Sequence, residues 1–338
     1  YLEPDILVVT NFFRDQLDRY GELYNTLRGV QSGIQKTAKT KLVLNADDSL
    51  CASLGRISDR EVIYYGMLSC AYDCTEESTN TDAMYCLYCK TRYDYSYHVY
   101  GHLGGFRCPN CGYEQPMPTV ACTKIKELAS TYSDIRFNIA GSDVDYEARI
   151  NLPGLFNVYN ALAAAACGHM LGLPIENTIK AMGTFECGFG RMETIKTEGK
   201  NIKIILVKNP TGFNQVLSFL QTEESRMQIA FLINDKLADG TDISWLWDVD
   251  FEKLQNIQDR LDNIYTSGIR AEDMAVRLKY AGVSTDKISI IKDYKELINT
   301  GLGRTPEGGT FYILPSYTAM LEMRSILRKK FKLEEFWK

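Results

Sequence analysis

Four cysteines, arranged in two pairs, could bind a metal ion. Cys86 and Cys89 form one Cys-x-x-Cys motif, Cys108 and Cys111 form another, and eighteen residues lie between the motifs. Each motif lets two thiolates converge on one ion, and two motifs complete the tetrahedral all-sulfur shell that Zn²⁺ prefers. A closed shell leaves no position for water or substrate, so we expect it to stabilise a small ribbon without catalysing a reaction. The alternative is four unrelated thiols in a protein core.

The cysteines lie in a segment, residues 84–117, that we predict to be a zinc ribbon inserted into a larger domain. Tyrosines are frequent in this segment. They could stack on nucleic-acid bases or pack a very small core, and we favour the core. His98 and His102 also lie here and could compete for the ion, but four cysteines already satisfy it. The function must therefore be sought in other residues.

Length and composition restrict the class of protein. With 338 residues, the chain is long enough for two domains with substantial cores. A net charge of −5 argues against broad nucleic-acid binding, which needs clustered positive charge. Ten cysteines, only four of them in metal-site spacing, are typical of a reducing compartment in which thiols stay free. The sequence has no apolar run of the roughly eighteen residues that a membrane-spanning helix needs.

Short hydrophobic segments alternate with amphipathic ones, which predicts an α/β fold with doubly wound sheets. In the first half we expect strands at 6–10, 41–45, 63–66, 135–139 and 146–150, and helices at 17–35, 158–171 and 175–182. After a turn at 188–191, we expect strands at 202–207, 229–233, 263–265, 287–291 and 310–313, and helices from 214, at 271–281 and at the C-terminal end. We therefore predict two domains, residues 1–194 and 195–338.

Four segments, in the same order along the chain, resemble motifs of the Mur ligase superfamily, the ATP-dependent amide-forming enzymes of peptidoglycan synthesis. They are residues 10–21 (TNFFRDQLDRYG), 44–48 (LNADD), 154–164 (GLFNVYNALAA) and 190–193 (GRME). The resemblance implies a partial Mur ligase central domain that carries the four-cysteine zinc ribbon as an insertion. A Rossmann-like α/β C-terminal domain would follow it.

The resemblance also implies contacts with the nucleotide. The matching motif contains Asn157 and Asn160, and the asparagine at the position of Asn157 contacts adenine in the superfamily. The arginine at the position of Arg191 reaches the nucleotide phosphates, with the bidentate geometry that suits a guanidinium group. Simpler alternatives are a helix N-cap for Asn157 and a surface hinge for Arg191.

Two further groups of polar residues follow predicted strands, where ligands bind in open α/β sheets. The first group is Asn11, Arg14, Asp15 and Asp18, and the second is Lys208 and Asn209. Each group has a simpler alternative. A capped helix start with i,i+4 pairing would explain the first group, and a plain turn before a proline would explain the second.

Three more segments narrow the resemblance to one branch, the synthetase subunits of lipid II isoglutaminyl synthases. They are residues 207–215, 247–252 and 267–282. The resemblance implies that ATP, with Mg²⁺, activates the α-carboxyl of D-glutamate in the lipid II stem peptide as an acyl phosphate. Ammonia from a GatD-like glutaminase subunit, bound as a heterodimer, would then give D-isoglutamine.

The same resemblance implies a cytoplasmic protein that works at the inner face of the cell membrane, where its lipid substrate resides. The basic run 324–332 could lie near anionic lipid, or it could be a solvated helix end. Two other functions stay open. One is an amino-acid-adding ligase of the Mur or folylpolyglutamate type, and the other is a non-catalytic zinc-ribbon interaction protein.

An acidic, aromatic stretch could complete the active site of the glutaminase. Asp248 and Asp250 lie close to Trp245 and Trp247, in a setting typical of protein interfaces. A Cys–His pair in a glutaminase needs a third group that orients the imidazole. We predict that this chain supplies that carboxylate in trans, from Asp248. The alternative is helix capping ahead of residues 251–257, with tryptophans that belong to the core.

The sequence departs from the superfamily in its phosphate-binding loop and at two positions that bind metal in relatives. It has no Gly-x-x-x-x-Gly-Lys-Thr/Ser loop to cradle phosphates, and it begins at Tyr1 without a methionine. We expect that loop to lie upstream in a longer protein, and we expect this polypeptide alone not to turn over ATP. Gln16 stands where relatives carry a metal-binding histidine, and Gln31 lies near the place of a carbamylated lysine. A second Mg²⁺ site is therefore open to doubt.

Overall fold

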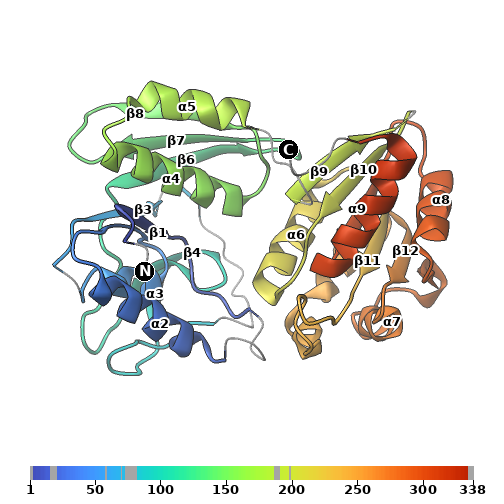
Figure 1. The fold of residues 1–338 in the computed structure, drawn as a ribbon, viewed down its shortest axis with the longest axis horizontal. Coiled ribbons are helices and arrows are strands. Elements are labelled where there is room, and N and C mark those ends of the chain that lie inside the picture. Colours follow the sequence, from blue (N-terminus) through green and yellow to red (C-terminus); the bar gives the residue numbers. More distant parts are fainter. Residues whose placement is uncertain are drawn as a thin grey trace. The chain divides into compact units, whose positions relative to one another are not determined.

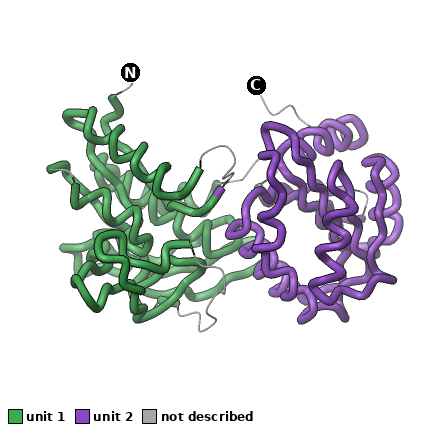
Figure 2. The backbone as a smooth tube through the Cα atoms, turned by 90° about the horizontal axis from the view of Figure 1, so that it is seen from below, with its two compact units in different colours: residues 1–14, 20–186 green, residues 15–19, 187–338 purple. Residues whose placement is uncertain are grey.

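The computed structural model describes residues 3–15, 21–57, 59–69, 71–72, 82–185, 191–197 and 199–333. The chain forms two compact units, residues 1–14 with 20–186 and residues 15–19 with 187–338 (Figure 2). The division falls at residue 186 and not at 194, because the strand at 191–196 pairs within the second sheet. No helix among the described residues is long and apolar enough to cross a membrane.

A six-stranded sheet forms the centre of the first unit as far as the structure describes it (Figure 1). Its strands lie in the order β1-β2-β3-β6-β7-β8. The pairs from β1 to β6 are parallel, and the pairs β6-β7 and β7-β8 are antiparallel. The bounds are β1 Ile6–Val9, β2 Lys41–Asn45, β3 Val62–Met67, β6 Val120–Leu128, β7 Ser133–Ile139 and β8 Asp145–Ile150. All but β6 were predicted.

Helices cover both faces of this sheet. Successive apolar side chains of β2 point to opposite faces, and each face needs a cover. Leu42 and Leu44 pack in one core with α2 and α3, and Val43 packs in another core with α4. The helices are α2 Leu23–Lys36, α3 Ser49–Leu54, α4 Leu155–Met170 and α5 Ile175–Thr184. The predicted helix at 17–35 begins only at Leu23, and residues 16–20 lie outside the described part of the chain.

The segment between β3 and β6 folds into a two-stranded antiparallel sheet of β4, Asp94–Tyr100, and β5, Leu103–Arg107. Tyr93, Phe106 and Tyr113 pack with the buried cysteines of this segment in a small core of their own. The core interpretation of the tyrosines is therefore confirmed for Tyr93, and Tyr97 is buried in the neighbouring core of the sheet, whereas Tyr85 and Tyr88 are exposed.

The second unit is also doubly wound. Its sheet has the order β13-β12-β11-β14-β10-β9 in the described residues, and β9 is the antiparallel strand. One core lies between the sheet and α6, α7 and η2, and another lies against α8 and α9. The strands are β9 Arg191–Lys196, β10 Asn201–Ile205, β11 Met227–Leu232, β12 Leu261–Ser267, β13 Ile288–Ile290 and β14 Thr310–Pro315. The helices are α6 Pro210–Thr222, η1 Ser244–Asp248, η2 Phe251–Ile257, α7 Ala271–Tyr280, η3 Thr285–Lys287, α8 Tyr294–Arg304 and α9 Tyr317–Phe331. β9 and α8 were not predicted.

Candidate metal centre and ligand-binding edge

The four predicted metal ligands come together in one cluster. Their sulfur atoms all lie within 4.8 Å of one another. Cys86 and Cys111 have their sulfurs 3.5 Å apart, and Cys89 and Cys108 have theirs 3.3 Å apart. Sulfurs bound tetrahedrally to zinc, each about 2.3 Å from the metal, lie about 3.8 Å from one another. Both the donor set and the spacing therefore fit Zn²⁺.

The two Cys-x-x-Cys motifs have the same backbone turn. The amide of Lys90 donates to the carbonyl of Cys86 (2.9 Å), and the amide of Gly112 donates to the carbonyl of Cys108 (3.0 Å). Lys90 and Gly112 each follow the second cysteine of a motif, and both have positive φ angles, 61° and 72°. A left-handed residue at this point reverses the chain, so the two sulfurs of a motif face the same point. Glycine adopts this conformation without the steric cost that lysine incurs.

The sulfurs of this cluster do not ionise independently. Hydrogen bonds with the side chains of Thr91 and Asn110 lower the pKa of Cys89 to about 5. The Tyr113 amide lowers the pKa of Cys111, but partial desolvation and the three neighbouring sulfurs raise it to about 12. A divalent cation removes this repulsion, because all four sulfurs can then be thiolates on one ion. The cluster is a closed site with the chemistry of a structural zinc centre.

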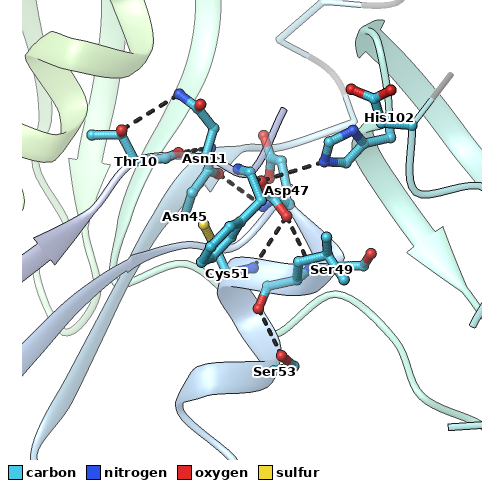
Figure 3. A network of polar contacts seen from close by, with 12 residues as sticks. Thr10, Asn11, Asn45, Asp47, Ser49, Cys51, Ser53 and His102 are labelled. Carbon is cyan, nitrogen blue, oxygen red and sulfur yellow. Dashed lines mark hydrogen bonds and ion pairs between the residues drawn. The ribbon is translucent and has the colours of Figure 1, made fainter. Parts of the chain in front are cut away.

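A second group of polar residues lies where β1 and β2 end, at the edge of the sheet where ligands bind in such folds (Figure 3). The Asn45 side chain donates to the Thr10 carbonyl (3.0 Å) and accepts from the Asp47 amide (3.0 Å). Asn11, a predicted ligand residue, follows Thr10 and is exposed. This candidate ligand-binding edge, residues 10–14 and 45–48, thus combines an exposed amide side chain with a buried hydrogen-bonded support.

Asp48, in the loop after β2, is fully buried and has four partners. As the N-cap of α3 it accepts hydrogen bonds from the amides of Leu50 (2.8 Å) and Cys51 (3.1 Å). It also accepts from the Phe12 amide (2.6 Å), and its Oδ2 lies 3.3 Å from Nε2 of the fully buried His102. Burial raises the pKa of Asp48, but His102 and the amides outweigh it and hold that pKa below its usual value.

Asp47, its neighbour, is also fully buried but has a different set of partners. It accepts from the Met67 amide (2.9 Å), the Gln115 side chain (2.5 Å) and the Tyr159 hydroxyl (2.5 Å). Burial raises its pKa to about 6, and hydrogen bonds from Tyr159 and Met67 oppose the shift. Both aspartates belong to the LNADD motif at residues 44–48. No local pattern pointed to Gln115 or Tyr159, which come from distant segments.

Three predicted ligand residues form ion pairs. The Arg14 amide donates to Asp82 (3.0 Å), and the Arg14 guanidinium pairs with the same carboxylate. Within the second unit, Lys208 Nζ lies 2.6 Å from Asp15 Oδ2. The structure therefore brings together members of both predicted groups that follow strands. Asp18 lies outside the described residues.

Local hydrogen bonds hold the asparagine pair in α4. Asn157 lies inside the helix, and Gly154 is the N-cap, so the capping alternative for Asn157 is wrong. The Asn157 side chain donates to the Pro153 carbonyl (2.8 Å) and accepts from the Asn160 side chain (3.3 Å). Asn157 is buried, and Asn160 is exposed. Of the two, Asn160 is the one that solvent reaches.

Asn209 and Arg191 flank the first parallel strand of the second unit. Asn209 is the N-cap of α6, where its side chain accepts from the Gly212 amide (2.8 Å). Arg191 begins β9, and its side chain lies outside the described part of the structure. A structural role is therefore established for Asn209, and nucleotide binding by either residue stays a prediction.

Asp248 ends η1, in the loop between β11 and β12, and is half-buried. Trp247 beside it is 54% exposed and packs edge-on against Tyr280, with 5.7 Å between ring centroids. Asp250 precedes η2 without making a capping hydrogen bond, so the capping alternative is not observed. The Asp250 side chain instead accepts from Asn214 (3.1 Å).

Comparison with known proteins identifies the family. A family model described as MurT ligase C-terminal matches residues 206–320. The MurT subunit of the glutamine-hydrolysing lipid II isoglutaminyl synthase of Streptococcus pneumoniae is 32% identical over 98% of this chain. The corresponding subunit of Staphylococcus aureus is 35% identical over 97% of it, and each match covers 71% of the relative.

This chain belongs to the MurT family.

Solved structures of wider relatives have the same fold as this MurT-family chain. A pseudomurein peptide ligase type C from Methanothermus fervidus superposes with a TM-score of 0.69 at 23% identity, covering 97% of this chain and 64% of that one. MurF from Acinetobacter baumannii gives 0.65 at 16% identity, with 98% and 61% covered. The chain therefore spans less than two thirds of these ligases, and the predicted Mur ligase-like α/β fold is confirmed.

Proposed function

We propose that this MurT-family chain is the ATP-dependent synthetase subunit of a lipid II isoglutaminyl synthase. The observation that carries the proposal is 32–35% identity, over 97–98% of the chain, to two proteins with that name. In the proposed reaction the α-carboxyl of D-glutamate in the lipid II stem peptide becomes an amide, which gives D-isoglutamine. The protein works in the cytoplasm, at the inner face of the cell membrane.

The chemistry requires activation of the acid, because a carboxylate is a poor electrophile and oxide is a poor leaving group. A carboxylate oxygen attacks the γ-phosphorus of ATP, and ADP leaves, which yields an acyl phosphate. Ammonia then attacks the acyl carbon, and inorganic phosphate leaves with formation of the amide. Mg²⁺ would bind the phosphate oxygens of ATP. Ammonia is mostly protonated near neutral pH, so a GatD-like glutaminase subunit that releases it locally supplies the reactive form.

Residues at the strand ends are the proposed ligand contacts. Parallel strands end at the edge where nucleotides bind in open α/β sheets, which supports this assignment. The adenine would contact the amide pair in α4, and the phosphates and acid would contact Arg191 and polar residues of both sets that follow strands. The residues are Asn157 and Asn160 for adenine, and Asn11, Arg14, Asp15, Arg191, Lys208 and Asn209 for the charged groups.

Asp248 is the proposed contribution to the glutaminase subunit. Its carboxylate would accept a hydrogen bond from the catalytic histidine of the partner, which fixes the imidazole tautomer and stabilises the imidazolium form. Support comes from its surroundings, because exposed Trp247 and Tyr280 form an aromatic contact of the kind that anchors protein interfaces.

The proposal is tested by glutamine-dependent amidation of lipid II by the full-length protein, with and without a co-expressed glutaminase subunit. We expect product only when ATP and both subunits are present. ATP consumption that depends on an added amino acid, and not on the glutaminase, would instead identify an amino-acid-adding ligase.

Asp248→Asn tests the contribution in trans, with Asp250→Asn as the matched control two residues away. In the reconstituted complex we expect Asp248→Asn to lower kcat for glutamine hydrolysis by at least about a hundredfold, because the change removes the group that orients the histidine. Subunit association should be unchanged. Equal rates for the two variants would remove Asp248 from the mechanism.

A further inference from the structure

The cysteine-rich insertion contacts the ligand-binding edge through side chains and backbone. We define this ribbon insertion as residues 82–117, and all of it belongs to the first unit. Asp82, His102 and Gln115 make three of these contacts, and their side chains are separate from the four cysteines. In Figure 3, His102 points toward the polar residues at the ends of β1 and β2. The insertion is therefore part of the support of the edge.

Gln115 links the insertion to the loop after β2. Its Nε2 group donates to Asp47 Oδ1 (2.5 Å) and to the Tyr97 hydroxyl (2.7 Å), which uses both amide hydrogens. The Tyr97 hydroxyl in turn donates to the Met67 carbonyl (2.6 Å). The Asp47 carbonyl also accepts from the Gly104 amide (3.1 Å), so backbone and side chain of this aspartate are both held by the insertion.

Tyr100, the last residue of β4, and His102, in the turn between β4 and β5, reach the segment that follows β1. The His102 ring packs against the Phe13 ring, with 4.7 Å between centroids, and Phe13 also stacks on Tyr100 at 6.0 Å. The same histidine lies 3.3 Å from Asp48, whose carboxylate binds the Phe12 amide. One side chain of the insertion thus fixes both segments of the edge.

Asp82 is the third contact. Its side chain is 5% exposed, accepts from the Arg14 amide (3.0 Å) and pairs with the Arg14 guanidinium. Asp82 precedes the first cysteine of the cluster by only four residues. A predicted ligand residue is therefore held by the chain that leads directly into the metal site.

These contacts stay in position only while the cysteine cluster is well ordered. Gln115 follows Cys111 closely, and its backbone amide donates to the Phe106 carbonyl (2.9 Å) beside the second cysteine motif. A two-stranded hairpin alone is marginally stable in water, and small zinc sites derive much of their folding free energy from the ion. Loss of the ion should therefore loosen the hairpin and release the groups that reach the edge.

We propose that the ribbon insertion is a positioning element of the ligand-binding edge, so that zinc binding at the four cysteines is coupled to ligand affinity at residues 10–14 and 45–48. Asp82, His102 and Gln115 are its positioning residues. This inference rests on the proposed function in one respect, because it takes the edge to bind Mg²⁺–ATP or the acid substrate. It gives the zinc ribbon a purpose that a closed four-cysteine site alone does not.

The first test is amide hydrogen exchange of the full-length protein in complex with its glutaminase, zinc-loaded and after zinc removal. The reporters are the amides of Phe12, Arg14 and Met67, which donate to Asp48, Asp82 and Asp47. We expect their exchange to accelerate about tenfold or more on zinc removal, because each loses a charge-assisted hydrogen bond. The paired strands β7 and β8 should keep their protection. Unchanged exchange at the three reporters, or equal loss throughout the first unit, would overturn the proposal.

The second test is the variant Gln115→Met, which keeps the side-chain length and removes both donors. Glu114→Gln is the control, because Glu114 is adjacent and its exposed side chain pairs only weakly with Arg107 (3.5 Å). We expect Gln115→Met to retain zinc but to bind Mg²⁺ with a non-hydrolysable ATP analogue about tenfold more weakly. Exchange at Met67 should accelerate as well. Zinc retention with unchanged binding and unchanged exchange would contradict the coupling.

The exchange measurement separates this inference from the proposed function. A complex that fails to amidate lipid II, yet shows zinc-dependent exchange and analogue binding at the edge, would support the coupling and refute the synthetase assignment. Full amidation by zinc-free protein with unchanged exchange would do the reverse.

Discussion

His102 Nε2 lies 3.3 Å from Asp48 Oδ2, and both side chains are fully buried. The carboxylate comes from the loop after β2, and the imidazole comes from the turn between β4 and β5. Burial alone would raise the pKa of Asp48, but His102 and the backbone amides keep that pKa below its usual value. A charged carboxylate is therefore stable in this core only because its partners replace water.

Removal of the histidine should expose this dependence. We expect His102→Leu to lower the free energy of unfolding by about 3 kcal/mol, because it leaves Asp48 buried with one partner fewer. The double variant Asp48→Asn/His102→Leu should be less destabilised than the sum of the single changes. Urea unfolding of the four proteins of this cycle measures the coupling. His98→Leu, in the same hairpin, is the control, and additive effects at Asp48 and His102 would show that the pair does not interact.

Asp47 should make stability depend on pH in the opposite sense from a typical surface carboxylate. Burial raises its pKa to about 6, above the value of about 3.9 in an unfolded chain. Between these values the folded protein binds a proton that the unfolded chain has released, so the contribution of Asp47 to stability falls as the pH rises.

Asp47→Asn isolates this contribution because an amide does not titrate. We expect the unfolding free energy of the wild type, minus that of the variant, to fall by about 1 kcal/mol from pH 5 to pH 7.5. The difference also cancels titration at the cysteines, which both proteins share. A difference that is flat, or that rises with pH, would show that Asp47 is ionised throughout this range.

Local sequence information was sufficient for the parts of the structure that depend on spacing and hydrophobic pattern. The spacing of the four cysteines predicted that their thiols come together, and short apolar runs predicted most strands of both sheets. α8 was missed because Gly301 and Gly303 are typical of helix ends. The structure explains Gly301, since a Cβ there would lie 2.4 Å from the Phe311 ring. β9 was missed because it begins within a motif that we interpreted as a hinge.

The support of the candidate site could not be predicted in this way. Gln115 lies 68 residues from Asp47, and Tyr159 lies 112 residues from it. These contacts exist because a hairpin docks on the sheet edge and α4 packs across the sheet. No spacing rule within one segment contains that information, and a buried Gln or His has the same local signal as an exposed one.

The two cysteine motifs should respond in opposite ways to substitutions at their turns. Lys90→Gly relieves a left-handed lysine, so we expect it to be about 1 kcal/mol more stable than Lys90→Ala. Alanine is the proper reference because both changes remove the contact of the Lys90 ammonium with the Tyr24 ring (5.0 Å).

Gly112→Ala should cost about 1 kcal/mol through backbone strain alone, since a Cβ there meets no atom within 4 Å. Thermal unfolding of the zinc-loaded proteins measures these differences, and equal stability of Lys90→Gly and Lys90→Ala would contradict the argument.

Arg277 should control the position of the loop that carries Asp248. Its buried guanidinium donates to the carbonyls of Leu246 (3.1 Å) and Val249 (2.7 Å), on either side of Asp248, and pairs with Glu252 (2.9 Å). Lysine cannot reproduce this fork, so Arg277→Lys leaves at least one carbonyl without its donor. We expect kcat for glutamine hydrolysis by the reconstituted complex to fall about tenfold, with KM and subunit association nearly unchanged, because the carboxylate moves while the rest of the interface stays. Arg270→Lys, at the N-cap of the same helix α7, where the ion pair with Asp235 is partly exposed, is the control and should have little effect. A loss of association equal to the loss of rate would show that Arg277 only maintains the fold, and full activity would show that the loop needs no such anchor.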